Sequence, residues 1–196
     1  MLVGLTGQTG AGKSEVCTIL FEHGFDIINA DSVARDVTRE GGKCLREIVS
    51  AFTDRILLPN GELDRKALGL TVFSDKKQLK KLESIIFPYI LNEIEKRVQA
   101  LRPGSKGIFL DAPTLFESGV DKSCDKVCSV IAPREIRLSR IIERDKITPE
   151  AAELRMNSQP EDEFYTARSN YVIINNGTRD ELKNAVCDMI GSLGLE

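Results

Sequence analysis

The segment Gly7-Gln8-Thr9-Gly10-Ala11-Gly12-Lys13-Ser14 determines how the rest of this sequence is interpreted. It matches the pattern G-x-x-x-x-G-K-[ST], in which glycines allow a tight turn and let consecutive backbone N–H groups point at an anion. Lys13 is a flexible point charge that can reach the outer phosphates of a nucleotide, and the Ser14 hydroxyl can bind Mg²⁺. The pattern therefore predicts a phosphate-binding loop, and we assign the nucleotide contacts to Gly10, Ala11, Gly12, Lys13, Ser14 and Glu15.

The residues on either side of the loop support this prediction. Residues 1–6 are mostly apolar and end at the first glycine, as expected of a buried parallel strand. After Ser14, apolar residues recur at helical spacing from Val16 to Phe21. An ordinary glycine-rich turn between a strand and a helix is the alternative, but the order of strand, loop and helix favours phosphate binding.

Length and composition indicate a soluble globular protein of one domain with room for a small insertion. The chain has 196 residues and a formal net charge of −3, and its acidic and basic residues are interleaved, so we expect no nucleic-acid partner. No apolar run is long enough to span a bilayer, and no signal peptide is recognisable, so we expect no membrane partner. The five cysteines are irregularly spaced, which favours reduced thiols and a cytoplasmic location over a disulfide framework.

Apolar segments predicted as strands alternate with segments of helical periodicity along the chain. This alternation predicts an α/β fold with a five-stranded parallel sheet and helices on both of its faces. Residues 57–104 have only helical patterns, so this region is the natural insertion, where a lid or substrate domain belongs. The predicted strands are residues 1–6, 25–28, 107–110, 127–131 and 171–174.

Two aspartates follow predicted strands. Asp31 precedes a helix, so it is either the helix N-cap or a catalytic carboxylate at the C-terminal edge of the sheet, and its position alone favours neither. Asp111 directly follows the apolar segment 107–110, which lies downstream of the phosphate loop. A carboxylate in this position is expected to hold Mg²⁺ directly or through water, and a turn or helix-cap residue is the alternative.

Three arginines after the fourth predicted strand fall on one helical face. Arg137, Arg140 and Arg144 are spaced i, i+3 and i+7. Such a row is usually a solvated helix surface, but guanidinium groups also match phosphate oxygens, and this row follows a strand in a chain with a phosphate loop. A phosphate clamp is therefore at least as well supported as a solvated surface.

Taken together, these segments resemble the dephospho-CoA kinase family, and the resemblance covers nearly the whole chain. The phosphate loop by itself is shared by many nucleotide-hydrolysing proteins, whereas the segments around Asp31 and Asp111 together are far more selective. Asn29-Ala30-Asp31-Ser32-Val33-Ala34-Arg35 is similar to the family's D-A-D-x-x-A-R. The other matching segments are residues 4–7, 63–65, 72–73, 111–117, 144–145, 155–156 with Gln159, 172–173 and 175–177.

The resemblance implies a P-loop NTPase type of fold and ATP-dependent phosphorylation of the ribose 3′-hydroxyl of dephospho-CoA, which gives coenzyme A. It implies the cofactors ATP and Mg²⁺, small-molecule substrates, and a monomer or weak homo-oligomer. Lys13, Asp31 and Arg140 are then the catalytic residues, and Asp31 meets the acceptor hydroxyl.

The resemblance also implies the remaining binding residues. Ser14 and Asp111 would hold the metal, and Arg144, Asn175 and Gly177 would join the nucleotide contacts. Acceptor contacts are implied for Asp31, Arg35, Arg65, Asp111, Pro113, Leu115 and Phe116.

By similarity with the family, the single kinase domain has three parts. The family usually has His-Pro where this chain has Phe87-Pro88, so no histidine can act at that position. The expected parts are a nucleotide-binding core of residues 1–56, 105–132 and 170–196, a helical insertion of residues 57–104 that accepts the CoA substrate, and a lid with adjoining helices at residues 133–169.

Two other functions fit part of the sequence. Another small-molecule kinase, acting on a nucleoside or nucleotide, would share the loop and the lid, and a panel of substrates would distinguish it. A GTPase-like switch is disfavoured because the chain has no N-K-x-D motif and because Asp111 is followed by Ala-Pro-Thr rather than by x-x-Gly.

Overall fold

The computed structural model describes residues 1–73 and 75–195, which form two compact units. The sheet unit consists of Met1–Ile28 and the segment from Leu101 onward, and the helical unit consists of Asn29–Ala100. Each unit has an apolar core of its own. Ser74 and Glu196, which belong to the predicted insertion and core, lie outside the described residues.

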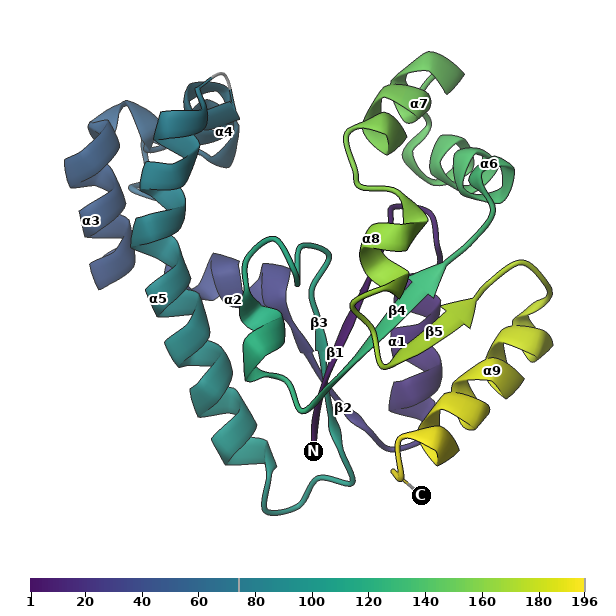
Figure 1. The fold of residues 1–196 in the computed structure, drawn as a ribbon. Coiled ribbons are helices and arrows are strands. Elements are labelled where there is room, and N and C mark those ends of the chain that lie inside the picture. Colours follow the sequence, from purple (N-terminus) through teal and green to yellow (C-terminus); the bar gives the residue numbers. More distant parts are fainter. Residues whose placement is uncertain (74, 196) are drawn as a thin grey trace. The chain divides into compact units, whose positions relative to one another are not determined.

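The sheet unit is built on five parallel strands in the order β2-β3-β1-β4-β5 (Figure 1). β1 lies in the middle and pairs in parallel with β3 on one side and with β4 on the other. The predicted five-stranded parallel sheet is therefore confirmed, and the strand ends differ from the prediction by no more than one residue. The strands are β1 Leu2–Gly7, β2 Asp26–Asn29, β3 Ile108–Asp111, β4 Lys126–Ile131 and β5 Tyr171–Ile174.

Both faces of the sheet are covered because neighbouring residues of a strand point to opposite sides. Leu5 is fully buried in the core that the sheet forms with the helices α1 and α9. Gly4 faces the other way, where a Cβ atom would lie 2.7 Å from a methyl carbon of Leu115. On β4, the Ser129 hydroxyl donates to the carbonyl oxygen of Tyr165 in α8 at 3.5 Å. Helices therefore lie on both faces, as predicted.

Local sequence signals set the ends of the helices in the sheet unit. Thr148 caps α7 by accepting a hydrogen bond from the Ala151 N–H, and Pro149 occupies the first turn. Thr178 and Glu181 form a capping box at the start of α9. The helices are α1 Lys13–Glu22, α6 Arg134–Asp145, α7 Pro149–Asn157, α8 Asp162–Thr166, α9 Arg179–Ser192 and the 3₁₀ helix η2 Val120–Ser123.

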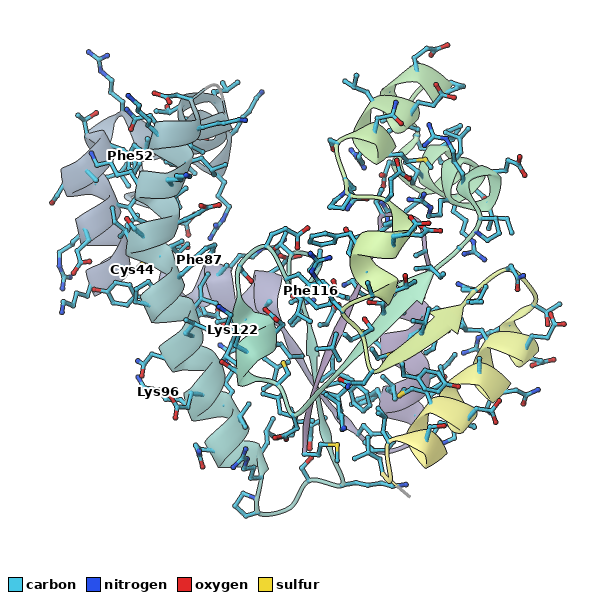
Figure 2. All side chains as sticks on the ribbon, in the orientation of Figure 1. Cys44, Phe52, Phe87, Lys96, Phe116 and Lys122 are labelled. Atoms are coloured by element: carbon cyan, nitrogen blue, oxygen red, sulfur yellow. The ribbon has the colours of Figure 1, made fainter. Side chains whose placement is uncertain are left out.

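The helical unit is held together by an apolar core between α3 and α5. Cys44 and Phe52, both labelled in Figure 2, lie on α3 and belong to this core. The Lys81 ammonium of α5 lies 5.1 Å from the centre of the Phe52 ring. Within the described residues, no helix is long and apolar enough to cross a membrane. The helices are α2 Ala30–Val37, α3 Lys43–Phe52, η1 Asp54–Ile56, α4 Arg65–Phe73 and α5 Lys76–Leu101.

The division into units falls at different residues from the predicted parts. Residues 29–56, which we predict in the nucleotide-binding core, lie in the helical unit, and the predicted lid 133–169 lies in the sheet unit, so the division into core, insertion and lid stays a prediction. The boundary differs because Ile48 on the apolar face of α3 packs with Leu68 of α4 and Leu82 of α5. An amphipathic helix joins the unit that covers its apolar face.

Candidate functional site

The loop after β1 requires glycine at two positions. Gly10 and Gly12 have φ angles of 78° and 97°, which are strained for residues with a side chain. A Cβ atom on Gly10 would lie 2.7 Å from the Arg137 carbonyl oxygen, and one on Gly12 would collide with the Asn175 side-chain amide. The loop leads into α1, whose first turn adds its backbone N–H groups and the positive end of the helix dipole.

Lys13 and Asp111 form an ion pair where β1 and β3 end. Parallel pairing sets Asp111 beside Leu5, two residues before the loop begins, and Lys13 is the first residue of α1. The two side chains are only 13% and 10% exposed, so solvent and salt screen their charges weakly. A positive and a negative group thus meet at the C-terminal edge of the sheet, where α/β proteins bind their ligands.

Arg140 and Asn175 hold the loop from the side of α6 and β5. The Asn175 amide donates to the Ala11 carbonyl oxygen at 2.8 Å, and Asn175 is only 5% exposed. The Arg140 guanidinium donates to the carbonyl oxygens of Gly10, Ala11 and Asn175, each at 3.4 Å. These contacts fix the carbonyl groups of the loop. The predicted contacts of Arg140 and Asn175 with a nucleotide stay predictions.

The three arginines of α6 do not form a single clamp. Arg137 is buried, with 4% exposure, and donates through Nε to the Ala132 carbonyl oxygen at 3.1 Å. Burial lowers the pKa of Arg137, and the nearby Asp162 carboxylate opposes that shift. Arg144 is on the surface and donates to both carboxylate oxygens of Asp145, at 2.7 and 2.9 Å. Among the three guanidinium groups, that of Arg140 has hydrogen bonds to the loop within the described structure.

Asp145 connects the ends of α6 and α7. It forms ion pairs with Arg144 and with Arg155 of α7. Hydrogen bonds from Arg144, together with the charges of both arginines, lower the pKa of Asp145 to about 2. The segment predicted as a lid is therefore fastened by charge at this point, and the predicted role of Arg144 toward the nucleotide stays a prediction.

The loop after β3 carries three residues with implied acceptor contacts. The Pro113 carbonyl oxygen accepts a hydrogen bond from Thr6, and Leu115 is fully buried against the sheet. Phe116, labelled in Figure 2, packs edge-on against Phe164, with ring centres 5.8 Å apart. In this structure the side chain of Leu115 serves the core, and its implied contact with a substrate is untested.

Two residues implied in nucleotide binding, Glu15 of α1 and Gly177, contact residues at the start of α9. The Glu15 carboxylate accepts a hydrogen bond from Arg179 at 2.6 Å, so its side chain is directed at α9. Gly177 lies so close to Glu181 that a Cβ atom would meet the carboxylate. Glycine at residue 177 therefore allows the capping box of α9 to form.

Asp31 is not the N-cap of the following helix. The cap is Asn29, whose side-chain oxygen accepts a hydrogen bond from the Ser32 N–H at 2.8 Å. Asp31 is exposed and lies in the first turn of α2. The capping interpretation of Asp31 is therefore wrong, because Asn29, two positions earlier, is the residue that caps the helix.

A pocket of about 670 Å³ in the helical unit contains Arg35 and Arg65. Arg65 donates to the Thr38 hydroxyl at 2.7 Å, and burial together with the charge of Arg35 lowers its pKa. Asp36, also at this pocket, pairs with Arg97 and Arg39. The lining contains three arginines, Arg35, Arg39 and Arg65, and three acidic residues, Asp36, Glu40 and Glu62, so the binding of an anionic ligand by Arg35 and Arg65 stays a prediction.

The oxygen donors beside the loop are of the kind that Mg²⁺ prefers. Mg²⁺ usually takes one or two protein oxygens and completes its shell with phosphate and water. The Ser14 hydroxyl at the start of α1 and the Asp111 carboxylate supply such a set. The described residues contain no group of three or more His, Cys, Asp or Glu side chains that could hold a metal alone, so a metal here would also need the phosphates.

Sequence reasoning missed one contact of the loop. The Thr9 N–H donates to the side-chain oxygen of Gln159, and the Gln8 side chain donates to the Pro160 carbonyl oxygen, both at 2.8 Å. Gln159 belongs to one of the family-like segments, but its partner Thr9 lies 150 positions away in the chain, so no local pattern predicts this contact.

Three kinds of comparison with known proteins each find the dephospho-CoA kinase family. A model of the dephospho-CoA kinase family matches residues 1–181. The chain is 42% identical over 182 residues to the dephospho-CoA kinase of Fusobacterium nucleatum and 41% identical over 184 residues to that of Geobacillus kaustophilus, with at least 92% of each chain covered. Its structure is similar to that of a dephospho-CoA kinase from Campylobacter jejuni, with a TM-score of 0.74 and 31% identity over 98% of this chain and 96% of the other.

Proposed function

The chain belongs to the dephospho-CoA kinase family, and on this premise we propose how its residues carry out the reaction. The reaction is the ATP-dependent phosphorylation of the ribose 3′-hydroxyl of dephospho-CoA, which completes the synthesis of coenzyme A. Phosphoryl transfer depends on positioning and on neutralising charge more than on covalent chemistry. The observation that carries the assignment is the enclosed pair of Lys13 and Asp111 beside the glycine loop.

On the ATP side, the loop holds the phosphates. Backbone N–H groups of the loop and of the first turn of α1 donate to the phosphate oxygens. Lys13 leaves Asp111 to meet the outer phosphates, and Arg140 adds a second positive charge. The polar segment around Asn175 and Gly177 lines the adenine pocket.

Ser14 and Asp111 would hold Mg²⁺, and phosphate oxygens of ATP would complete its oxygen donors. The metal would neutralise phosphate charge and orient the phosphates. The position of Asp111 supports this assignment, because its enclosed carboxylate lies at the end of β3 and is paired with Lys13 of the loop.

On the acceptor side, Asp31 takes the proton of the ribose 3′-hydroxyl. Arg35 and Arg65 hold the diphosphate of dephospho-CoA, for which a pocket with two adjacent guanidinium groups is suited. Pro113 and Phe116 complete the acceptor contacts, and the segment 133–169 acts as the lid.

The cellular setting follows from the same assignment. ATP is the phosphate donor and dephospho-CoA is a thiol, so we place the reaction in the cytoplasm, where both occur and thiols stay reduced. We also expect a monomer or weak homo-oligomer. The most exposed large apolar side chains, Phe21, Leu70, Leu154 and Ile174, lie on four different elements, and sedimentation equilibrium measures the state directly.

The test is a turnover assay with ATP and dephospho-CoA. The parent protein should produce ADP and coenzyme A, and Lys13→Ala should remain folded but lose at least about 100-fold in rate, because it removes a charge from the transition state. Lys122→Ala, which changes an exposed lysine of the same unit, is the matched control and should retain the parent rate. Equal rates for Lys13→Ala and the control, or preference for a nucleoside in a substrate panel, would contradict the proposal.

A further inference from the structure

The segment between α7 and α8 contacts the phosphate loop through a pair of hydrogen bonds. Gln159 Oε1 accepts from the Thr9 N–H at 2.8 Å, and Gln8 Nε2 donates to the Pro160 carbonyl oxygen at 2.8 Å. Two consecutive loop residues thus bind two consecutive residues of the segment. We call this contact, formed by Gln8, Thr9, Gln159 and Pro160, the glutamine clasp.

The orientation of Gln8 in the clasp is fixed. A carbonyl oxygen can only accept, so the NH₂ group of Gln8 must face Pro160, and the reversed amide would bring two oxygens together. Gln8 is only 3% exposed, and its Oε1 atom is one of the buried side-chain atoms for which no hydrogen-bond partner is found within the described structure. The bond to Pro160 is therefore the contact that positions this side chain.

The clasp binds a different group of the loop from those that Arg140 and Asn175 bind. Those two residues take the carbonyl oxygens of Gly10 and Ala11, whereas the clasp takes the Thr9 N–H. Between the two sets of contacts, the Ala11 N–H donates to the Gln8 carbonyl oxygen at 3.2 Å and closes a turn. Because the Thr9 N–H donates to Gln159, it does not point at a phosphate, and the N–H groups later in the loop are the ones that can bind the phosphates.

We propose that Gln159 is a positioning residue for ATP. It fixes the Thr9 peptide so that the loop presents its later N–H groups to the phosphates, and it acts through the loop without touching the nucleotide. This inference rests on the proposed use of the loop for ATP. It makes the segment that joins α7 and α8 part of the ATP site.

The first experiment compares Gln159→Met with Gln99→Met. Methionine has nearly the size of glutamine but offers no oxygen acceptor, and Gln99 is an exposed glutamine of α5. Gln159→Met should raise the KM for ATP about 3- to 10-fold, the range that the loss of one hydrogen bond gives, while the KM for dephospho-CoA stays within about twofold. Gln99→Met should change neither value. A merely structural role would lower the folded fraction, and hence the apparent kcat, without this separation of the two KM values.

The second experiment is a double-mutant cycle with Gln8→Met. If both glutamines hold the loop through one clasp, the double variant should raise the KM for ATP by less than the product of the two single effects. Equilibrium unfolding in urea shows that each variant is folded. An unchanged KM for ATP in folded Gln159→Met, equal rises in both KM values, or independent effects of the two glutamines would each overturn the proposal.

Calorimetric binding of ADP in the absence of an acceptor separates this inference from the proposed function. Weaker ADP binding by Gln159→Met than by Gln99→Met supports the clasp even if the parent fails to phosphorylate dephospho-CoA. If Gln159→Met binds ADP as tightly as the parent and the parent shows full turnover, the positioning role of Gln159 is contradicted and the proposed function is not.

Discussion

At the scale of single residues, the two carboxylates of the proposed reaction differ in their surroundings. Asp111 is enclosed beside the loop and paired with Lys13, whereas Asp31 is exposed in the first turn of α2. A metal-binding carboxylate belongs next to the phosphates, and a general base belongs next to the acceptor. Replacing each of the two aspartates should therefore change a different step of the reaction.

Asp31→Asn should keep its affinity for ATP and Mg²⁺ but lose about 10²- to 10⁴-fold in transfer rate, because it removes the proton acceptor. Asp111→Asn should instead raise the Mg²⁺ concentration needed for half the maximal rate. A Mg²⁺ titration of both variants, with ATP binding measured without acceptor, distinguishes the two roles. Loss of ATP binding by Asp31→Asn alone would mean that the roles are exchanged.

At the scale of elements, charge fastens α6 to α7. Asp145 near the end of α6 accepts from Arg144 and pairs with Arg155, and these partners lower its pKa to about 2. A carboxylate whose pKa is lower in the folded than in the unfolded chain stabilises the fold above its ordinary pKa of 3.8. That contribution is lost as the pH falls toward the folded-state value.

The pH dependence of unfolding should therefore change in Asp145→Asn. At pH 7 the variant should unfold at a lower urea concentration than the parent, and the difference should shrink as the pH falls from about 4 toward 2. Asp188→Asn, at an exposed position of α9, is the control. A difference between parent and Asp145→Asn that stays constant down to pH 2.5 would show that the ion pairs contribute nothing.

At the scale of the whole molecule, burial divides the five cysteines. Cys187 is exposed, whereas Cys44 and Cys128 are buried. Burial is the main cause that raises the pKa of Cys17 to about 12, and the charge of Asp111 adds to it while Lys13 opposes it. Burial likewise raises the pKa of Cys44 to about 11 and those of Cys124 and Cys128 to about 12.

Thiol reactivity should follow this division, because the thiolate is the reactive form. At pH 8 the native protein should react quickly with Ellman's reagent at Cys187 and slowly at the other four cysteines, and unfolding in guanidinium should make all five react. Cys187→Ser should remove the fast phase. A fast phase that persists in Cys187→Ser would place a second thiol at the surface.

Local patterns in the sequence determined the fold and the centre of the site. The strands are short apolar segments that end at recognisable turns, so the five-stranded parallel sheet and the position of the phosphate loop follow from residues close together in the chain. Asp111 beside Lys13 also follows, because the C-terminal ends of parallel strands meet at one edge of a sheet. The family-like segments gave the reaction, which the comparisons bear out.

Only the tertiary structure decided which of the equivalent side chains reach the loop. Periodicity set Arg137, Arg140 and Arg144 on one helical face, but burial under the loop and the partner Asp145 give each a different environment. The clasp to Gln159 joins residues 150 positions apart, so no local pattern announces it. The boundary between the two units, at residue 29, likewise depends on long-range packing, because the apolar face of α3 packs against α4 and α5. In each case the deciding free energy comes from burial and hydrogen bonds between segments distant in the chain, which become neighbours only in the folded protein.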